Sequence, residues 1–410
     1  MQYSSRSKEW IHCFLDRRYT TFSKIVFLVF ALRAIDGGML AFASNDYMPV
    51  LRNFMVIVAY STIPLGMLYV APKLGHINKQ DARLLLLPIV YFMFLLLHTY
   101  GGYGGDWITS FIAISCFCLM ERKDKAIIFD YFYWIIMQLN VFSRLAYIII
   151  VLKLPFGVEY VPYYTGNDCY YGKWLIFAVL EEGLGRFRLC GVFNEPGGLG
   201  TICSLLFVAK YSKCTKIEKI ILVITTILSF SLAGFLILFI FASIKLLTKN
   251  IKTAFLIIPL VILFVNLPKI DFGNPFLNSV AYRFSIIDGQ LAGNDRYGLA
   301  FKNMYNEFKT TSSYYLGLGA GVPISRGVST YKQLIFEYGI IGFGLLLLMF
   351  VVESWKRSLK NREALIFALL FLVSIYQRPL AIVGILGYVL LFGGIDNILE
   401  ESGRLVNNDW

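Results

Sequence analysis

The sequence predicts an all-α, polytopic membrane protein that crosses the bilayer about 12 times. Three observations support this prediction. Hydrophobic residues fill 57% of the 410 positions, and the mean hydropathy is +0.64. Charged residues make up only 16%, against about 25% in average soluble domains. Apolar runs recur along the whole chain without a long polar stretch between them. We therefore expect residues 1–410 to form a single transmembrane domain.

The apolar runs predict the individual helices. The polar, basic segment 1–21 lacks the apolar core and cleavage site of a signal peptide, so we expect the first span to remain as an anchor. The adjoining runs 218–230 and 232–246 have basic residues on both flanks, which favours a hairpin over one long bent helix. The expected helices are 22–43, 50–71, 83–99, 107–120, 126–152, 196–209, 218–230, 232–246, 253–267, 333–353, 364–377 and 380–394.

Charge sets the expected orientation. With twelve spans, one side carries both termini and the basic segments "PKLGHINKQDAR", "ERKDK", "KYSKCTKIEK", "KLLTKNIK" and "SWKRSLKNRE". The positive-inside rule places that side in the cytoplasm. The net charge of +12 is then largely a topological signal, and no basic patch remains that would favour a nucleic-acid partner.

Two loops on the outer side, 153–195 and 268–332, are too long to be simple connections. They are rich in aromatic residues and glycines, which is not the composition of disorder. In the second loop, Phe301, Met304, Tyr305 and Phe308 are spaced as on one face of a helix. That helix could lie on the membrane surface or over a cavity, or simply pack on the bundle.

Metal and nucleotide chemistry are disfavoured. The three histidines, His12, His76 and His98, have no second ligand at metal-binding spacing. The chain also has no nucleotide-type glycine loop on its cytoplasmic side. We therefore expect no metal and no cofactor. Cys169 and Cys190 share the first outer loop and could pair if that loop faces an oxidising space.

Arginines are frequent on the outer side, and the arginine fork matches phosphate oxygens. Together they suit an anionic lipid head group such as a pyrophosphate, although each could instead contact phospholipid or pair with Glu181, Glu182, Asp288 or Asp295. Within the spans, Arg33 and Asp36 are three residues apart and could pair. The outer arginines are Arg186, Arg188, Arg283, Arg296, Arg326 and Arg378.

The stretch "RFRLCGVFNEPGGLG" combines these features at residues 186–200. Pro196 suits the first turn of a helix, which places Glu195 at or just before the helix start. Free N–H groups and partial positive charge gather there, and the glycines that follow leave room for a ligand. The stretch predicts an anion-binding corner with one carboxylate directed into it.

The pattern R-x-x-G-x-F-x-E-P, formed here by Arg188, Gly191, Phe193, Glu195 and Pro196, resembles the O-antigen and capsular polysaccharide polymerases of the Wzy type. The serine-rich "SFSLAG", then "GLGAG" and "STYKQLIFEYGIIG", are similar to later elements of that family, so the resemblance covers about residues 185–350. It implies a GT-C-like glycosyltransferase architecture with two large periplasmic loops, in the bacterial inner (cytoplasmic) membrane.

The resemblance implies a function as well. Such enzymes polymerise oligosaccharide repeats carried on undecaprenyl pyrophosphate, which serve as donor and acceptor, at the periplasmic face during lipopolysaccharide or capsule biosynthesis. They need neither metal nor nucleotide. Membrane lipids, a chain-length regulator and a flippase are candidate partners.

The expected mechanism needs positive groups at the departing pyrophosphate and a base for the acceptor hydroxyl, with inversion at the donor carbon. Arg188, Arg283 and Arg296 are assigned to the pyrophosphate, with Arg186 and Arg326 in reserve. Glu195 is the expected base, with Asp295 as the alternative; Glu195 could instead cap its helix or pair with Arg188.

Two rival functions remain. An O-antigen ligase transfers the finished polymer to lipid A core, and that family carries a histidine in its second large outer loop. Residues 268–332 contain none, which favours the polymerase. A transporter or flippase of lipid-linked oligosaccharide would need charged, water-lined helices and often internal repeats. No repeat is evident in this sequence.

Overall fold

The computed structural model describes residues 19–36, 49–76, 79–97, 105–162, 170–182, 186–249, 266–273, 299–319, 331–359, 361–375 and 384–402, with short pieces between 259 and 291. The N-terminal half contains α2 (Thr21–Asp36), α3 (Pro49–Val70), the 3-10 helix η2 (Ala71–His76), α4 (Lys79–Leu84), α5 (Leu86–Leu97), α6 (Gly105–Leu119), α7 (Arg122–Val151), β1 (Glu159–Pro162), β2 (Tyr170–Trp174), β3 (Phe177–Glu182) and β4 (Arg186–Gly191).

The C-terminal half contains α8 (Pro196–Ala209), α9 (Lys216–Leu228), α10 (Leu232–Lys249), η3 (Leu267–Lys269), β5 (Ile286–Ile287), β6 (Gln290–Leu291), α14 (Leu299–Phe308), α15 (Ser313–Leu316), α16 (Tyr331–Ser358), α17 (Arg362–Ile375), α18 (Ile385–Tyr388), the π-helical turn η6 (Val389–Gly393) and α19 (Gly394–Glu401). The predicted helix 253–267 lies almost wholly outside the described residues.

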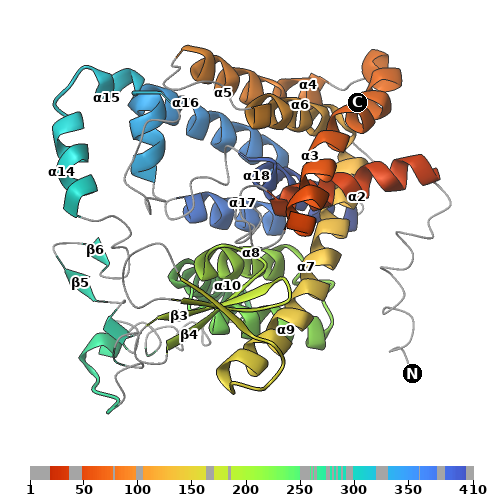
Figure 1. The fold of residues 1–410 in the computed structure, drawn as a ribbon. Helices are drawn as coiled ribbons and strands as arrows, with labels where there is room; N and C mark the ends of the chain where they lie inside the picture. The colour runs from red at the N-terminus through yellow and green to blue at the C-terminus, as the bar shows by residue number, and fades with distance from the viewer. Residues whose placement is uncertain are drawn as a thin grey trace.

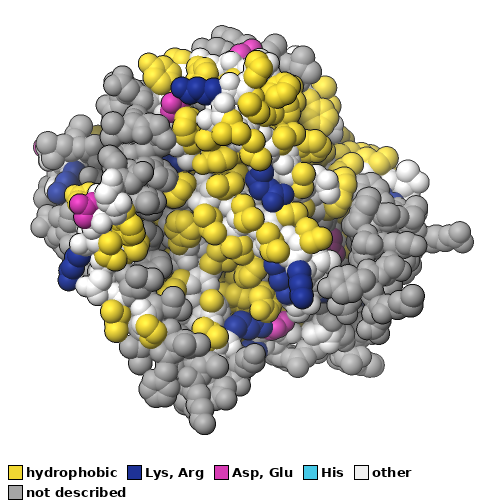
Figure 2. All heavy atoms as spheres, turned by 90° about the horizontal axis from the view of Figure 1, so that it is seen from below, with side chains coloured by type: hydrophobic (Ala, Val, Ile, Leu, Met, Phe, Trp, Pro, Cys, Tyr) yellow, Lys and Arg dark blue, Asp and Glu magenta, His cyan; other side chains and the backbone are white. Residues whose placement is uncertain are grey.

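The chain is mainly helical and has membrane character. Three described helices are long and apolar enough to cross a bilayer: Arg52–Gly75, Arg122–Val151 and Tyr331–Ser358. Other apolar helices, such as α8 and α9, have 14 and 13 residues and are shorter than the about 20 residues of an independent span. Figure 2 shows one face of the molecule as a broad field of hydrophobic side chains with a few lysines and arginines. Large apolar side chains are exposed along α3, α7, α9 and α16, as expected for surfaces in contact with lipid.

The helices form a layered bundle (Figure 1). Helices α5, α6, α16 and α17 run roughly parallel across the view, with α5 contacting α6 and α16, and α16 contacting α17. Helices α14 and α15 and the β5–β6 hairpin gather at the left-hand end. The predicted hairpin 218–230/232–246 is two helices, α9 and α10, and both pack against α8. A capping box starts α9: Glu218 N donates to Thr215 Oγ1 and Thr215 N donates to Glu218 Oε2.

The first outer loop contains strands, which the all-α prediction did not include. Strands β1 to β4 form a four-stranded antiparallel sheet in the order β1-β2-β3-β4. One face presents Phe177, Val179 and Leu189 to the main core and packs on α7, while β4 also contacts α8. Strand β4 alternates polar and apolar residues in Arg186, Phe187, Arg188 and Leu189, so its apolar side chains share the face that is buried against the helices.

The predicted amphipathic helix in the second outer loop exists as α14, and the packing alternative is the one observed. Phe301, Tyr305 and Phe308 are buried in one cluster with Ile335 and Phe336 of α16. The apolar face of α14 therefore lies on the bundle.

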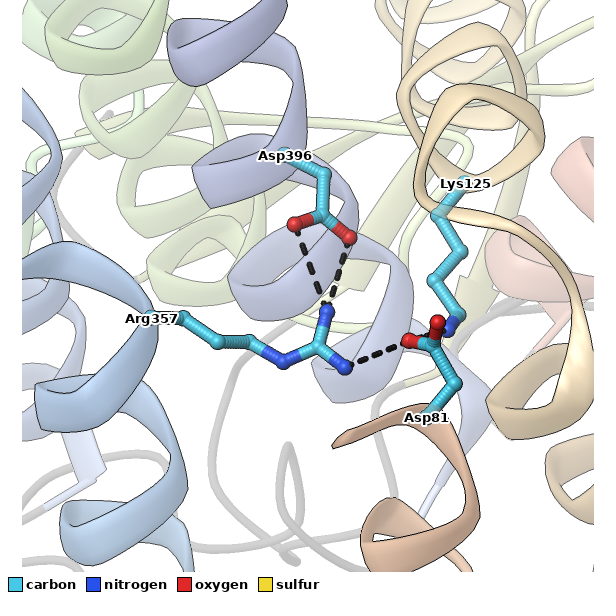
Figure 3. A network of polar contacts seen from close by, with 4 residues as sticks. All are labelled: Asp81, Lys125, Arg357 and Asp396. Carbon is cyan, nitrogen blue, oxygen red and sulfur yellow. Dashed lines mark hydrogen bonds and ion pairs between the residues drawn. The ribbon is translucent and has the colours of Figure 1, made fainter. Parts of the chain in front are cut away.

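A buried ionic network joins distant parts of the chain (Figure 3). The Arg357 guanidinium lies between two carboxylates: Nη1 donates to Asp396 Oδ2 at 2.9 Å and Nη2 to Asp81 Oδ1 at 2.7 Å. Lys125 Nζ donates to Asp81 at 2.8 Å. Burial would raise the pKa of Asp81, but Lys125 and Arg357 outweigh it and lower that pKa. The four residues tie α4, α7, α16 and α19 together.

Further ion pairs join the basic segments to one another and to the helix ends. Lys73 pairs with Asp124 at 3.1 Å, Lys245 with Glu363 at 2.8 Å, and Lys210 with Asp130. The segments around 73–83, 121–125, 245–249 and 355–363 are thereby linked by contact. This is the grouping that the charge pattern predicts for one side of the membrane.

Candidate functional site

The site is built around the passage from β4 into α8. Gly191 ends the strand with φ +63, and a Cβ there would lie 2.9 Å from Ser143 Oγ of α7. Only glycine meets both conditions without strain. Phe193 is buried, and Phe193 N donates to Cys190 O. This tight turn sets Arg188 and Glu195 on either side of one corner.

Glu195 immediately precedes α8. Its backbone is extended (φ −138, ψ 135), and its carbonyl accepts from Gly198 N at 3.1 Å. Its half-buried side chain makes no capping hydrogen bond. Pro196 occupies the first turn, as predicted. Side-chain capping, one of the alternatives for Glu195, is therefore absent from the structure.

Arg188 reaches from β4 to the turn between α9 and α10. Its Nε donates to Ser229 O at 3.3 Å, and its Nη2 to Phe230 O at 3.4 Å. Phe230 has φ +47, so this turn is tight and unusual for a side-chain-bearing residue. The guanidinium thus anchors the serine-rich turn that the resemblance singled out.

The same turn is fastened to the start of α8. Ser231 Oγ donates to Gly197 O at 3.0 Å, and Thr201 Oγ1 donates to the same oxygen at 2.8 Å. A Cβ on Gly200 would lie 2.2 Å from Ser229 Oγ. Gly200 therefore allows close packing of α8 on the turn. At this position the glycine does not leave room for a ligand, contrary to the prediction.

Helix α7 contributes polar groups that the sequence analysis did not assign to the site. Asn140 and Ser143 are buried, and Asn140 Nδ2 lies 3.2 Å from Cys203 Sγ of α8. Arg144 Nε donates to Asn140 O at 3.1 Å. Tyr171 OH of β2 donates to Asn194 O, beside Glu195. Polar residues within an apolar helix could have drawn attention to Asn140 and Ser143, since such residues are costly in a bilayer.

The predicted site residues are only partly placed. Arg188 lies in β4 and Glu195 directly before α8, so the two residues flank the passage between these elements. Arg186 begins β4, and only its backbone is described. Cys190 is buried in the sheet with its Sγ 3.7 Å from Arg188 O, and Cys169 lies outside the described residues. Also outside them are Arg283, Asp295, Arg296, Arg326 and Arg378. Within the spans, Arg33 donates to Ser110 Oγ at 3.2 Å.

A second structured junction lies where the second outer loop enters α16. The helix is broken at Gly339 (φ 69, ψ 170). Leu318 N and Gly319 N donate to Phe336 O and Glu337 O, both at 2.9 Å. Gln333 Nε2 donates to Glu337 Oε1 at 2.9 Å. Glu337 is thus a second half-buried carboxylate held at a helix break, and the sequence analysis did not single it out.

Chemically, the first corner combines a fixed guanidinium, a half-buried carboxylate and the start of a helix. Such a corner can bind an anionic group and accept a proton nearby. Within the part of the chain that the structure describes, no group of three or more His, Cys, Asp or Glu side chains is placed to hold a metal ion. No protein-family model matches the chain, and no match was found among curated proteins or solved structures.

Proposed function

We propose that this protein is a membrane-embedded glycosyltransferase of the Wzy type, which polymerises polyprenyl-pyrophosphate-linked oligosaccharide repeats on the outer face of the bacterial inner membrane. The observation that carries the proposal is the corner formed by Arg188, Glu195 and the Ser229–Ser231 turn. It brings together two of the motifs on which the family resemblance rests, "RFRLCGVFNEPGGLG" and "SFSLAG". The proposal retains about 12 spans, with both termini in the cytoplasm.

The proposed reaction is inverting glycosyl transfer. An acceptor hydroxyl oxygen bonds to the anomeric carbon of the donor sugar, and the bond from that carbon to the pyrophosphate oxygen breaks. Arg188 stabilises the negative charge that the leaving lipid pyrophosphate gains, aided by Arg283 and Arg296 and, in reserve, Arg186 and Arg326. Glu195 takes the hydroxyl proton, or Asp295 does so in its place.

Reconstitution tests this proposal. Purified protein in proteoliposomes, supplied with lipid-linked repeats as donor and acceptor, should produce a ladder of longer lipid-linked glycans and release free lipid pyrophosphate. We expect the ladder to persist in excess chelator, because the proposed groups are all organic. A glycan formed only when lipid A core is added would identify a ligase. Movement of intact repeats across the bilayer without new linkages would identify a flippase.

A further inference from the structure

A hollow of about 720 Å³ lies between the turn that follows α7 and the outer part of the sheet. Its lining includes Lys153 and Gly157 from the turn, Tyr160 from β1, Tyr170 from β2 and Glu181 from β3. The volume is in the range of small-molecule sites, about 300–1,000 Å³. The Arg188 corner does not share these residues.

Strand register gathers these side chains on one face. Tyr170 is paired directly with Glu181, and Tyr160 is paired with Gly172. A Cβ on Gly172 would lie 2.6 Å from Ile150 Cγ2 of α7 and 3.6 Å from the Tyr160 ring. The glycine therefore lets β2 pack closely on α7 beside that ring. Partial burial and the charge of Glu181 both raise the pKa of Tyr160, as expected if ring and carboxylate lie close together.

Lys153 holds its place by an unusual backbone conformation. It has φ +51, just beyond the end of α7. Leu154 N donates to Ile149 O at 2.9 Å, which closes the helix end. Glycine is the usual residue at such a position, because other side chains are strained there. The chain has a lysine there, and Lys153 lines the hollow.

The lining chemistry selects the class of ligand. Among the described lining residues, one lysine and one glutamate balance in charge, which does not favour a polyanion such as a pyrophosphate. Tyrosine rings offer apolar faces with a polar edge, and both tyrosines are about half exposed, at 48% and 44%. A carboxylate accepts hydrogen bonds from hydroxyls and an ammonium donates to them. A saccharide ring, with an apolar C–H face and a rim of hydroxyls, matches this set.

The level of the hollow along the membrane normal agrees with a polar ligand. Helix α7 has 30 residues and is therefore about 45 Å long. The hydrocarbon core is about 30 Å thick. Because the basic, ion-paired end of α7 starts at Arg122, its other end reaches the head-group level or beyond. A lipid tail would not be bound there, whereas sugars carried above a lipid head group would be.

We infer that this hollow is a saccharide subsite, which holds sugar rings of the glycan chain at a distance from the reacting end. That the glycan is a growing polymer rests on the proposed function. Arg188 pairs with Leu180, whereas Glu181 pairs with Phe187. Neighbouring strand residues point to opposite faces, so the hollow and Arg188 lie on opposite faces of the sheet. A glycan chain bound in the hollow would thus be held at a distance from the proposed reaction at Arg188. It would remain bound between successive additions.

Binding is measured first, without turnover. The probes are short oligosaccharides cut by mild acid from the surface polysaccharide of the cells that carry this protein. Saturation-transfer NMR with the full-length protein in nanodiscs should show contact, and titration gives Kd. We expect Tyr160→Ala and Tyr170→Ala each to weaken binding about tenfold or more. Tyr160→Phe and Tyr170→Phe retain the rings and should bind within about threefold of wild type.

The matched control is Phe156→Ala. Phe156 is an aromatic residue in the same turn, 60% exposed, and it does not line the hollow. Its loss should leave Kd unchanged. The inference is overturned if the alanine variants bind the oligosaccharides like wild type, or if Phe156→Ala loses binding equally. It is also overturned if the oligosaccharides do not bind in the hollow and phosphatidylglycerol vesicles do. The last result would identify a lipid head-group contact.

Polymer length gives a second readout. In proteoliposomes, Tyr160→Ala should shorten the product ladder while the rate of the first coupling stays within about twofold of wild type. A saccharide that binds in the hollow of a protein that forms no polymer would refute the proposed function and leave the subsite standing. A slowed first coupling with unchanged ladder length would overturn the subsite's role in retention.

Discussion

Arg188 illustrates how one side chain can serve the fold and the proposed chemistry together. Two of its nitrogens hold adjacent carbonyl oxygens, Ser229 O and Phe230 O, at the turn between α9 and α10. This requires the planar fork of arginine, because a lysine ammonium is a compact point charge. The guanidinium is therefore pre-oriented at the corner where Glu195 begins its helix.

Arg188→Lys should reduce glycan polymerisation by about tenfold or more while the protein still inserts into the membrane. The charge remains, but the two-carbonyl contact does not. Ladder formation by purified protein and the melting temperature in detergent measure the two effects separately. Lys213→Arg, at an exposed position at the other end of α8, is the matched control and should change neither. Wild-type turnover in Arg188→Lys would exclude a role for fork geometry.

Glu195→Gln separates chemistry from structure. An amide keeps the size of the carboxylate and most of its hydrogen-bonding capacity, so the melting temperature should change little. If Glu195 is the base, turnover should fall by about 10²–10⁴-fold. Full turnover would refute that assignment, and Asp295→Asn and Glu337→Gln would then be tested in the same assay.

At the scale of elements, hydrophobic runs predicted helix positions well. They did not predict the features that depend on tertiary contacts. The expected helix 196–209 matches α8, and 50–71 matches α3 within a residue at each end. The sheet was missed because its strands have only four to six residues and are stabilised by packing on α7. The break at Gly339 was missed because it depends on contact with residues 317–319, which no local pattern reveals. Of the predicted site, the structure describes the side chains of Arg188 and Glu195, which flank the passage from β4 into α8.

The Gly339 junction gives a prediction at this scale. A Cβ on Gly339 would lie 2.3 Å from Tyr315 O, and its φ of +69 disfavours any other residue. Gly339→Ala should therefore destabilise the protein by at least about 2 kcal/mol and lower its melting temperature. Gly344 lies in the same helix with open space around its Cβ position. Gly344→Ala should be neutral or slightly stabilising. Equal melting temperatures for both variants would show that the junction is not tightly packed.

At the scale of the whole molecule, the buried network ties the C-terminal helix α19 to α4, α7 and α16. Its two carboxylates and two cations are charge-balanced, and Asp396 is fully buried. Charges in four segments far apart in sequence gave no local signal of this arrangement. In the sequence, Asp81 and Lys125 resemble ordinary loop charges. Only the tertiary structure brings them into contact.

Arg357→Met should destabilise the protein by about 3–5 kcal/mol, because Asp396 loses its guanidinium partner while it stays buried. Asp81 keeps Lys125 in this variant. The double variant Arg357→Met with Asp396→Leu removes the stranded charge and should recover most of the lost melting temperature. A double variant that is no more stable than the single one would contradict this account of the network.

The network also marks one end of the bundle, which allows the orientation to be tested. After the break at Gly339, residues 340–358 of α16 continue to the end of the helix and span about 28 Å, close to the thickness of the hydrocarbon core. Arg357 lies near its last turn, while the α15 segment pairs with its first turns through Leu318 and Phe336. A label near α15 and a label near the network should therefore report opposite sides of the membrane.

Ser312 and Lys123 are exposed and lie beside these two ends. Cys116, Cys118, Cys190, Cys203 and Cys214 are buried, so a parent chain with Cys13 and Cys169 replaced by serine should give little background. In intact cells, Ser312→Cys should react with a membrane-impermeant thiol reagent, and Lys123→Cys should react only after the membrane is opened. The positive-inside rule requires this result, because the basic segments gather at the network end. If Lys123→Cys alone reacted in intact cells, the true topology would be the reverse of the predicted one. It would place the Arg188 corner on the cytoplasmic side, where polymerisation at the outer face could not occur.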